Sequence, residues 1–276
     1  MSIHLSILTF LVSLLAGLIG SLLGLGGGII VTPFLTLVAH IDIRHAIGAT
    51  LISVIATSSG SAVAYLRERI TNIRIAMFLE IGTTSGALTG AIIATSIKPN
   101  ILFIIFGIVM LYSSVQMFKT RKQELPKEVK ASPLAKALKL NDSYYDEALG
   151  REVVYEVTGV GQGISTLFIA GIVSGLLGLG AGVFKVLAMD TFMRLPMKVS
   201  TTTSNFMIGV TAAASAGYYL AHGFIDPFIT APVALGVLIG AMFGTRVLFK
   251  IRSTTIRLLF ALVVLLIAIR MIIQGL

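Results

Sequence analysis

Two ionisable side chains lie inside long apolar stretches of this sequence, where a charge is costly and usually serves a function. Lys185 lies in the apolar run 164–193, just after a glycine-rich motif, and Glu80 lies one to two turns inside the run 75–97. A buried ammonium group could complete a pocket for a small oxyanion, and a buried carboxylate could couple proton movement to transport. The alternatives are that Lys185 extends toward lipid headgroups and that Glu80 pairs with an arginine at the membrane interface.

Hydroxyl and amide side chains form a second candidate group. Thr50 is repeated as Ser204, and Asn205 stands beside Ser204 where the first copy has Leu51. Further hydroxyls follow at spacings of seven and four residues, which places each series on one helical face. These are Thr57 and Ser61 in the first copy, and Thr211 and Ser215 in the second. Such donors bind anion oxygens and also pack membrane helices together. Both readings stay open for Thr50, Ser204 and Asn205, and we favour packing for the others.

A glycine-rich motif that occurs twice supplies the third candidate group. Its glycines are Gly24, Gly26, Gly27 and Gly28 in the first copy, and Gly178, Gly180 and Gly182 in the second. Glycine permits backbone geometries that break a helix, and a helix that begins at such a break directs its free amides at an anion. The alternative is a packing hinge that touches no ligand. A nucleotide-binding loop is excluded, because no Gly-Lys-Ser/Thr follows either copy.

The composition indicates a membrane protein. Of the 276 residues, 56% are hydrophobic and 12% are charged, and the mean hydropathy is +0.97. A membrane-spanning helix needs about 20 apolar residues. Besides the two glycine-containing runs, 5–39 and 164–193, six stretches reach roughly that length: 46–66, 75–97, 101–118, 200–221, 228–249 and 254–273. The net charge of +9 is concentrated at the ends of apolar runs, so we attribute it to membrane topology and predict no nucleic-acid partner.

The chain divides into two similar halves joined by a charged connector. The motif copies are 154 residues apart, and the same shift continues without a gap to the pair Phe106 and Phe260. We predict a first transmembrane repeat at 1–118, a connector at 119–163 and a second transmembrane repeat at 164–276. In the connector, aromatic and β-branched residues on both sides of Gly150 predict a short hairpin. Glycines at four-residue spacing, at 82–90 and 236–244, predict closely packed helix faces.

The positions of the basic residues distinguish two topologies. If each glycine-containing run crosses the membrane once, the basic residues divide 12 against 8; if each run enters and returns, they divide 17 against 3, with Lys185 left out as intramembrane. The second division satisfies the positive-inside rule. We therefore predict an all-α membrane protein of two inverted repeats of about four helices each. The first helix of each repeat is broken at the glycine motif, the connector is cytoplasmic and both termini lie outside.

Three motifs together resemble the TauE/SafE sulfite exporter family. They are Gly-Leu-Gly-Gly-Gly followed after four residues by Pro33, Ala-Ile-Gly-Ala-Thr ending at Thr50, and Thr-Ser-Asn-Phe-Met-Ile-Gly-Val-Thr-Ala over 203–212. The resemblance implies a multipass carrier of small sulfur-containing anions, such as sulfite and organosulfonates, in the cytoplasmic membrane. The second copy departs from the first, with Ala181 for Gly27 and Leu187 for Pro33, so the two motifs need not have equal roles.

These observations predict a secondary transporter that exports, or alternatively imports, a small anion by alternating access, and the resemblance implies that the anion contains sulfur. The predicted substrate-binding residues are the motif glycines with Thr50, Lys185, Ser204 and Asn205, and Glu80 is the coupling candidate. No ATP-binding motif is present, so the driving force would be ionic. No cofactor or metal is expected, because the chain has no cysteine and its histidines lack ligand spacing. The alternatives are an anion channel, an intramembrane enzyme and a passive assembly subunit.

Overall fold

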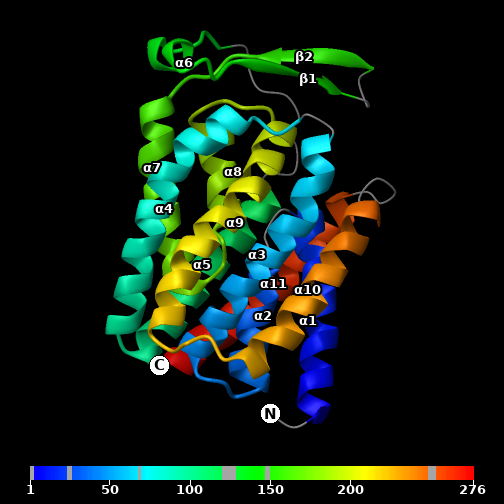
Figure 1. Cartoon of the computed structure of the whole chain (residues 1–276), viewed down its shortest axis with the longest axis vertical. Helices are drawn as coiled ribbons and strands as arrows, with labels where there is room; N and C mark the ends of the chain where they lie inside the picture. The colour runs from blue at the N-terminus through cyan, green and yellow to red at the C-terminus, as the bar shows by residue number, and fades with distance from the viewer. Residues whose placement is uncertain (1–2, 24–26, 68–69, 120–128, 147–149, 248–252) are drawn as a thin grey trace.

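The computed structural model shows a bundle of helices with a small hairpin across one end (Figure 1). It describes residues 3–23, 27–67, 70–119, 129–146, 150–247 and 253–276. The first half contributes α1 (Ile3–Leu23), α2 (Gly28–Pro33) with a π-helical turn at Phe34–Val38, α3 (Ile43–Arg67), α4 (Ile73–Ser96) and α5 (Pro99–Lys119). The second half contributes α7 (Val160–Leu177), α8 (Gly182–Thr191), α9 (Met197–Ala221), α10 (Pro227–Val247) and α11 (Ser253–Gly275).

The predicted all-α character and the six predicted long helices are confirmed, with ends within three residues of those expected. Local sequence explains several of the ends. Pro99 and Pro227 occupy the first positions of α5 and α10, where a missing N–H costs nothing. Asn72 caps α4 by accepting a hydrogen bond from the backbone N–H of Ile75. Within the described residues, α1, α4, α5, α7 and α10 are long and apolar enough to cross a membrane.

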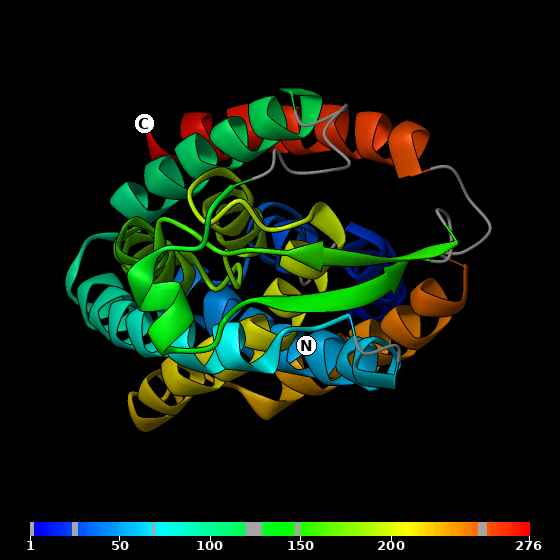
Figure 2. The ribbon, with the colours of Figure 1, turned by 90° about the horizontal axis from the view of Figure 1, so that it is seen from above.

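Helices from the two halves are paired with each other. α1 packs along α10, α4 along α7, and α5 along α11, while α3 and α9 cross at the centre and contact each other. Figure 2 shows α5 and α11 side by side at one edge of the bundle. Each pair takes one helix from each half, so neither half buries its apolar faces without the other.

Closely packed glycine faces join α4 to α7 and α10 to α1, as the four-residue spacing predicts. A Cβ atom at Gly86 would lie 2.1 Å from the carbonyl oxygen of Phe168, and one at Gly240 would lie 2.0 Å from that of Leu14. The two glycines differ by 154 residues, and so do their two neighbours. The contact of α4 with α7 is therefore repeated, with the two halves exchanged, in the contact of α10 with α1.

The connector contains α6 (Pro133–Ala137) and the predicted hairpin, formed by β1 (Asp142–Asp146) and β2 (Arg151–Tyr155). The side-chain amide of Asn72 donates to the Tyr155 hydroxyl and to the carbonyl oxygen of Leu140, and Lys198 Nζ donates to Asp146 at 2.7 Å. Burial raises the pKa of Tyr155 above its ordinary value. These contacts fix the connector to the first turns of α4 and α9.

Both ends of the described chain lie far from this hairpin. The first turn of α1 and the last turn of α11 are at the opposite end of the bundle (Figure 1). α8 lies toward the hairpin, and its far end is tied to the connector, since the backbone N–H of Thr158 donates to the carbonyl oxygen of Met193. α2 lies toward the end that holds the termini.

Candidate functional site

The two glycine motifs meet in the middle of the bundle. A Cβ atom at Gly28, the first residue of α2, would lie 3.0 Å from the carbonyl oxygen of Gly178. α7 ends at Leu177 and α8 begins at Gly182. Between them the backbone is left-handed at three positions, with φ of 68° at Gly178 and Gly180 and 49° at Ala181. Gly27 has the same φ of 68° just before α2, whereas Gly24 and Gly26 lie outside the described residues.

Close approach to the central helices explains why small residues are needed here. A Cβ atom at Gly180 would lie 3.0 Å from Val54 of α3 and 2.7 Å from Ile208 of α9, and these two neighbours are themselves 154 residues apart. α3 and α9 therefore hold the second motif between equivalent positions, so any side chain at Gly180 would push them apart.

Two of the predicted hydroxyl residues lie beside the first residues of α2 and α8. The Thr50 methyl group would lie 2.7 Å from a Cβ atom at Gly28, and the Thr50 hydroxyl shares a hydrogen bond of 2.8 Å with that of Thr32. Ser204 Oγ donates to the carbonyl oxygen of Gly182 at 3.3 Å. Thr50 and Ser204 are fully buried. Thr50 therefore lies beside the start of α2, and Ser204 lies beside the start of α8, where it could contact an anion bound there.

Lys185 and Glu80 are brought together through a third residue. Lys185 lies in the first turn of α8, is fully buried, and donates from Nζ to Thr211 Oγ1 of α9 at 2.5 Å. Thr211 Oγ1 in turn donates to Glu80 Oε1 of α4 at 2.6 Å. Thr84, one turn after Glu80, donates to the same carboxylate oxygen at 3.0 Å. Two charges of opposite sign from the two halves therefore share one buried hydroxyl group.

The sequence suggests a packing role for Thr211, whereas the structure gives it a hydrogen bond to each of the two charged groups. The sequence also offers an interfacial arginine as an alternative partner for Glu80. Arg74 instead donates to the carbonyl oxygen of Lys139 in the connector. The side chain of Arg67 and residue Arg69 lie outside the described part of the structure. The signal that could have found the bridge is the presence of two opposite charges in apolar runs together with a hydroxyl series.

The side-chain nitrogen of Asn205 and Glu80 Oε2 are among the buried polar atoms that have no hydrogen-bond partner within the described residues. Asn205 is 4% exposed, and its backbone carbonyl oxygen accepts from Ser58 Oγ of α3. An unsatisfied buried polar group costs about 1–3 kcal/mol. The amide nitrogen of Asn205 can therefore gain by donating to a ligand, and Glu80 Oε2 can gain by accepting a hydrogen bond.

The electrostatics favour an anion at the start of α8. The first turn of a helix carries partial positive charge, and Lys185 belongs to that turn of α8. The carboxylate of Glu80 neutralises it through Thr211. Within the part of the chain that the structure describes, no group of three His, Cys, Asp or Glu residues could hold a metal ion.

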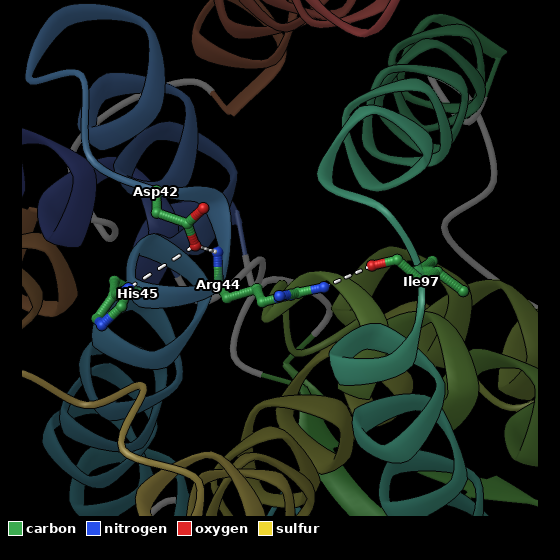
Figure 3. A network of polar contacts seen from close by, with 4 residues as sticks. All are labelled: Asp42, Arg44, His45 and Ile97. Atoms are coloured by element: carbon green, nitrogen blue, oxygen red, sulfur yellow. Dashed lines mark hydrogen bonds and ion pairs between the residues drawn. The ribbon is translucent and has the colours of Figure 1, made fainter.

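A separate polar network lies at the end of the bundle opposite to the hairpin (Figure 3). Arg44 donates from Nη2 to the carbonyl oxygen of Ile97 at 2.7 Å, and its guanidinium lies 5.8 Å from the ring centre of Phe224. Asp42 accepts from the backbone N–H of Arg44 and lies 3.7 Å from His45. The network ties the start of α3 to the α4–α5 turn and to the loop before α10, and we assign no ligand to it.

Comparisons with known proteins agree on one class. The family model described as "Sulfite exporter TauE/SafE" matches residues 9–271. The chain is 28% identical to the "Probable membrane transporter protein YunE" of Bacillus subtilis, covering 98% of both chains. It is 25% identical to YdhB of the same organism, covering 87% of this chain and 89% of YdhB. A relative from Methanocaldococcus jannaschii, also named a probable membrane transporter protein, is 24% identical over 92% of this chain and 90% of its own length. No solved structure matches the chain.

Proposed function

We propose, because the chain belongs to the sulfite exporter TauE/SafE family, that it is a secondary carrier for a small sulfur-containing anion. The protein is a multi-pass membrane transporter and not an enzyme. Sulfite or an organosulfonate is the proposed substrate, the cell membrane is the proposed location, and export is the proposed direction. The absence of an ATP-binding motif from the sequence supports an ionic driving force.

The observation that carries the substrate class is the fully buried Lys185 in the first turn of α8. A lysine placed there by chance would cost several kcal/mol if it stayed charged without a partner. Sulfite and sulfonate groups present several oxygen acceptors, which match an ammonium group, free helix amides and the hydroxyl of Ser204. The unpartnered amide nitrogen of Asn205 supplies a further donor. The first copy has Val31 and Leu51 at the positions of Lys185 and Asn205, so we place the anion in the second half.

Alternating access between two inverted repeats is the proposed mechanism. Gly86 of the first half contacts Phe168 of the second, and the equivalent Gly240 of the second half contacts Leu14 of the first. These reciprocal contacts support a two-fold relation between the repeats. The short helices α2 and α8 directed toward opposite ends of the bundle support an inversion, and the interruption between α7 and α8 supports broken helices. Such half-helices surround the substrate sites of many carriers.

The proposed orientation places the connector in the cytoplasm and both termini outside. The division of basic residues supports it, and so does the position of the first turn of α1 and the last turn of α11 at the end of the bundle opposite to the hairpin. We expect alkaline phosphatase, an enzyme that is active only outside the cytoplasm, to be active when fused after Leu276 and inactive when inserted in the connector. The reverse pattern would contradict this orientation.

Counterflow in proteoliposomes tests the carrier function. We expect vesicles loaded with unlabelled sulfite or sulfoacetate to take up the labelled anion faster than empty vesicles, with saturation at high outside concentration. A carrier shows this acceleration because its binding site can return across the membrane with unlabelled anion bound, which is faster than its return when empty. Uptake that neither saturates nor accelerates would favour an anion channel, and no uptake of any anion would contradict transport of this class.

A further inference from the structure

We propose that Glu80 is the resident counter-ion of Lys185, that an arriving anion replaces it, and that Glu80 then takes up one proton. This inference rests on the proposed anion-carrier function and names its coupling step. The carboxylate gains a proton from the solvent on the side where the anion enters, and the hydrogen bond that Lys185 donates to Thr211 is replaced by one that it donates to the anion. One monovalent anion and one proton would therefore cross together, and export would be driven by the anion's own outward gradient.

The geometry makes Thr211 the link between the two charges. Its hydroxyl oxygen accepts from Lys185 Nζ at 2.5 Å while its proton is donated to Glu80 Oε1 at 2.6 Å. The same hydroxyl lies 2.9 Å from the carbonyl oxygen of Met207, which offers its proton a second acceptor. If Glu80 becomes neutral, Thr211 can donate to Met207 and release Lys185 without leaving its own proton unpaired.

The charge balance of the buried site requires a proton. Without the anion, Lys185 and Glu80 sum to zero. A monovalent anion beside an ionised Glu80 would leave one uncompensated negative charge in a region where Lys185 is fully buried and Glu80 is 9% exposed. Burying such a charge is strongly unfavourable. Protonation of Glu80 restores neutrality when the anion is bound.

No other group on the surrounding elements offers this compensation. α4 packs against α7 and α9, and α7 carries no titratable side chain. The other titratable groups are Arg74 on α4, Asp190 on α8, and Lys198, Tyr218 and Tyr219 on α9. None of them makes a described hydrogen bond or ion pair with Glu80, and Lys198 is paired with Asp146.

The carboxylate also has an open position for the proton. Oε1 accepts from Thr84 and Thr211, whereas Oε2 is buried and has no hydrogen-bond partner among the described residues. A carboxylate whose second oxygen lacks donors is less stabilised than one with both oxygens bonded. Oε2 is therefore the atom that we assign to receive the proton.

Coupling of this kind makes net transport and exchange respond differently to Glu80→Gln. The glutamine mimics the protonated carboxyl, so an anion-loaded site is neutral and can exchange one anion for another. The empty site would hold Lys185 without a counter-ion and could not return across the membrane. We expect the variant to keep counterflow within about tenfold of the wild type and to lose net flux on the order of 100-fold.

The experiment measures net flux and counterflow of labelled methanesulfonate, a sulfonate with a single negative charge, in proteoliposomes between pH 5.5 and 8.5, with Glu152→Gln in the hairpin as the matched control. The wild type and the control should show net flux that follows the proton gradient, and Glu80→Gln should show counterflow with a flat pH profile. As a second measurement, the weakly buffered wild-type protein should take up about one proton per bound anion when methanesulfonate is added, read with a pH indicator.

Two results would overturn the coupling step and leave the carrier function intact. One is anion counterflow by a wild-type protein that takes up no proton on binding. The other is a Glu80→Gln variant with wild-type net flux and an unchanged pH profile. Absence of counterflow in the wild type would instead overturn the carrier function, and the coupling step with it. The proton measurement does not depend on how well the variant folds.

Discussion

Lys185→Ala is expected to reduce anion transport on the order of 100-fold or more, because it removes the buried cation beside the proposed binding position. The substitution also removes the counter-ion of Glu80, and loss of one partner of a buried charge pair destabilises a protein by about 3–5 kcal/mol. Transport should therefore be measured per folded molecule, from the monodisperse fraction that is reconstituted. Lys136→Ala, at an exposed lysine of α6, is the control and should transport as the wild type does.

A double variant separates binding from stability. Lys185→Ala combined with Glu80→Gln leaves no uncompensated charge, so we expect it to recover most of the lost thermal stability. It should still fail to transport, because no ammonium group is present for the anion. Recovery of transport in the double variant would mean that Lys185 is a structural partner of Glu80 and binds no substrate.

Gly86→Val is expected to prevent correct packing of α4 against α7. A Cβ atom at this position would lie 2.1 Å from a backbone carbonyl oxygen, so the helices must separate before any side chain fits. Overpacking of this kind costs about 3 kcal/mol when the neighbours are backbone atoms. We expect a strong loss of the monodisperse fraction in size-exclusion chromatography and a lower midpoint of thermal unfolding.

The matched control is Gly217→Val in α9, where a Cβ atom would meet no atom within 4 Å. It carries the same change in helix propensity and should leave the elution profile near that of the wild type. Gly240→Val, at the equivalent position of the other half, should behave like Gly86→Val. Equal behaviour of Gly86→Val and Gly217→Val would contradict the close-packing role of this face.

Sequence alone predicts the long helices well because each is marked by apolar length and by clear ends. The stretch 75–97 corresponds to α4 at Ile73–Ser96, and 200–221 corresponds to α9 at Met197–Ala221. The hairpin around Gly150 follows from a left-handed glycine between β-branched and aromatic residues, and its φ of 61° agrees. The inverted repeats and the broken first helices remain interpretations of the glycine motifs and the charge distribution.

The candidate site could be predicted only in part. Lys185 and Glu80 are conspicuous as charges in apolar runs, and Thr50 and Ser204 follow from the repeat. The contact between Lys185, Thr211 and Glu80 depends on how α8, α9 and α4 pack, and residues 26 to 131 positions apart in the chain carry no periodic signal of such a meeting. From the sequence alone, Thr211 is therefore interpreted as a packing hydroxyl, and its contacts with Lys185 and Glu80 are seen only in the packed structure.

Anion-dependent thermal stabilisation of the purified protein tests the central claim, binding of a sulfur oxyanion beside Lys185, most directly. A ligand at about 100 times its Kd stabilises the folded state by about 2.7 kcal/mol. We predict a saturable rise in the unfolding midpoint with sulfite, sulfoacetate or thiosulfate, a smaller rise with acetate, and none of these rises in the double variant of Lys185→Ala and Glu80→Gln. The claim would be contradicted if none of these anions raised the unfolding midpoint of the wild-type protein, or if they raised that of the double variant as strongly.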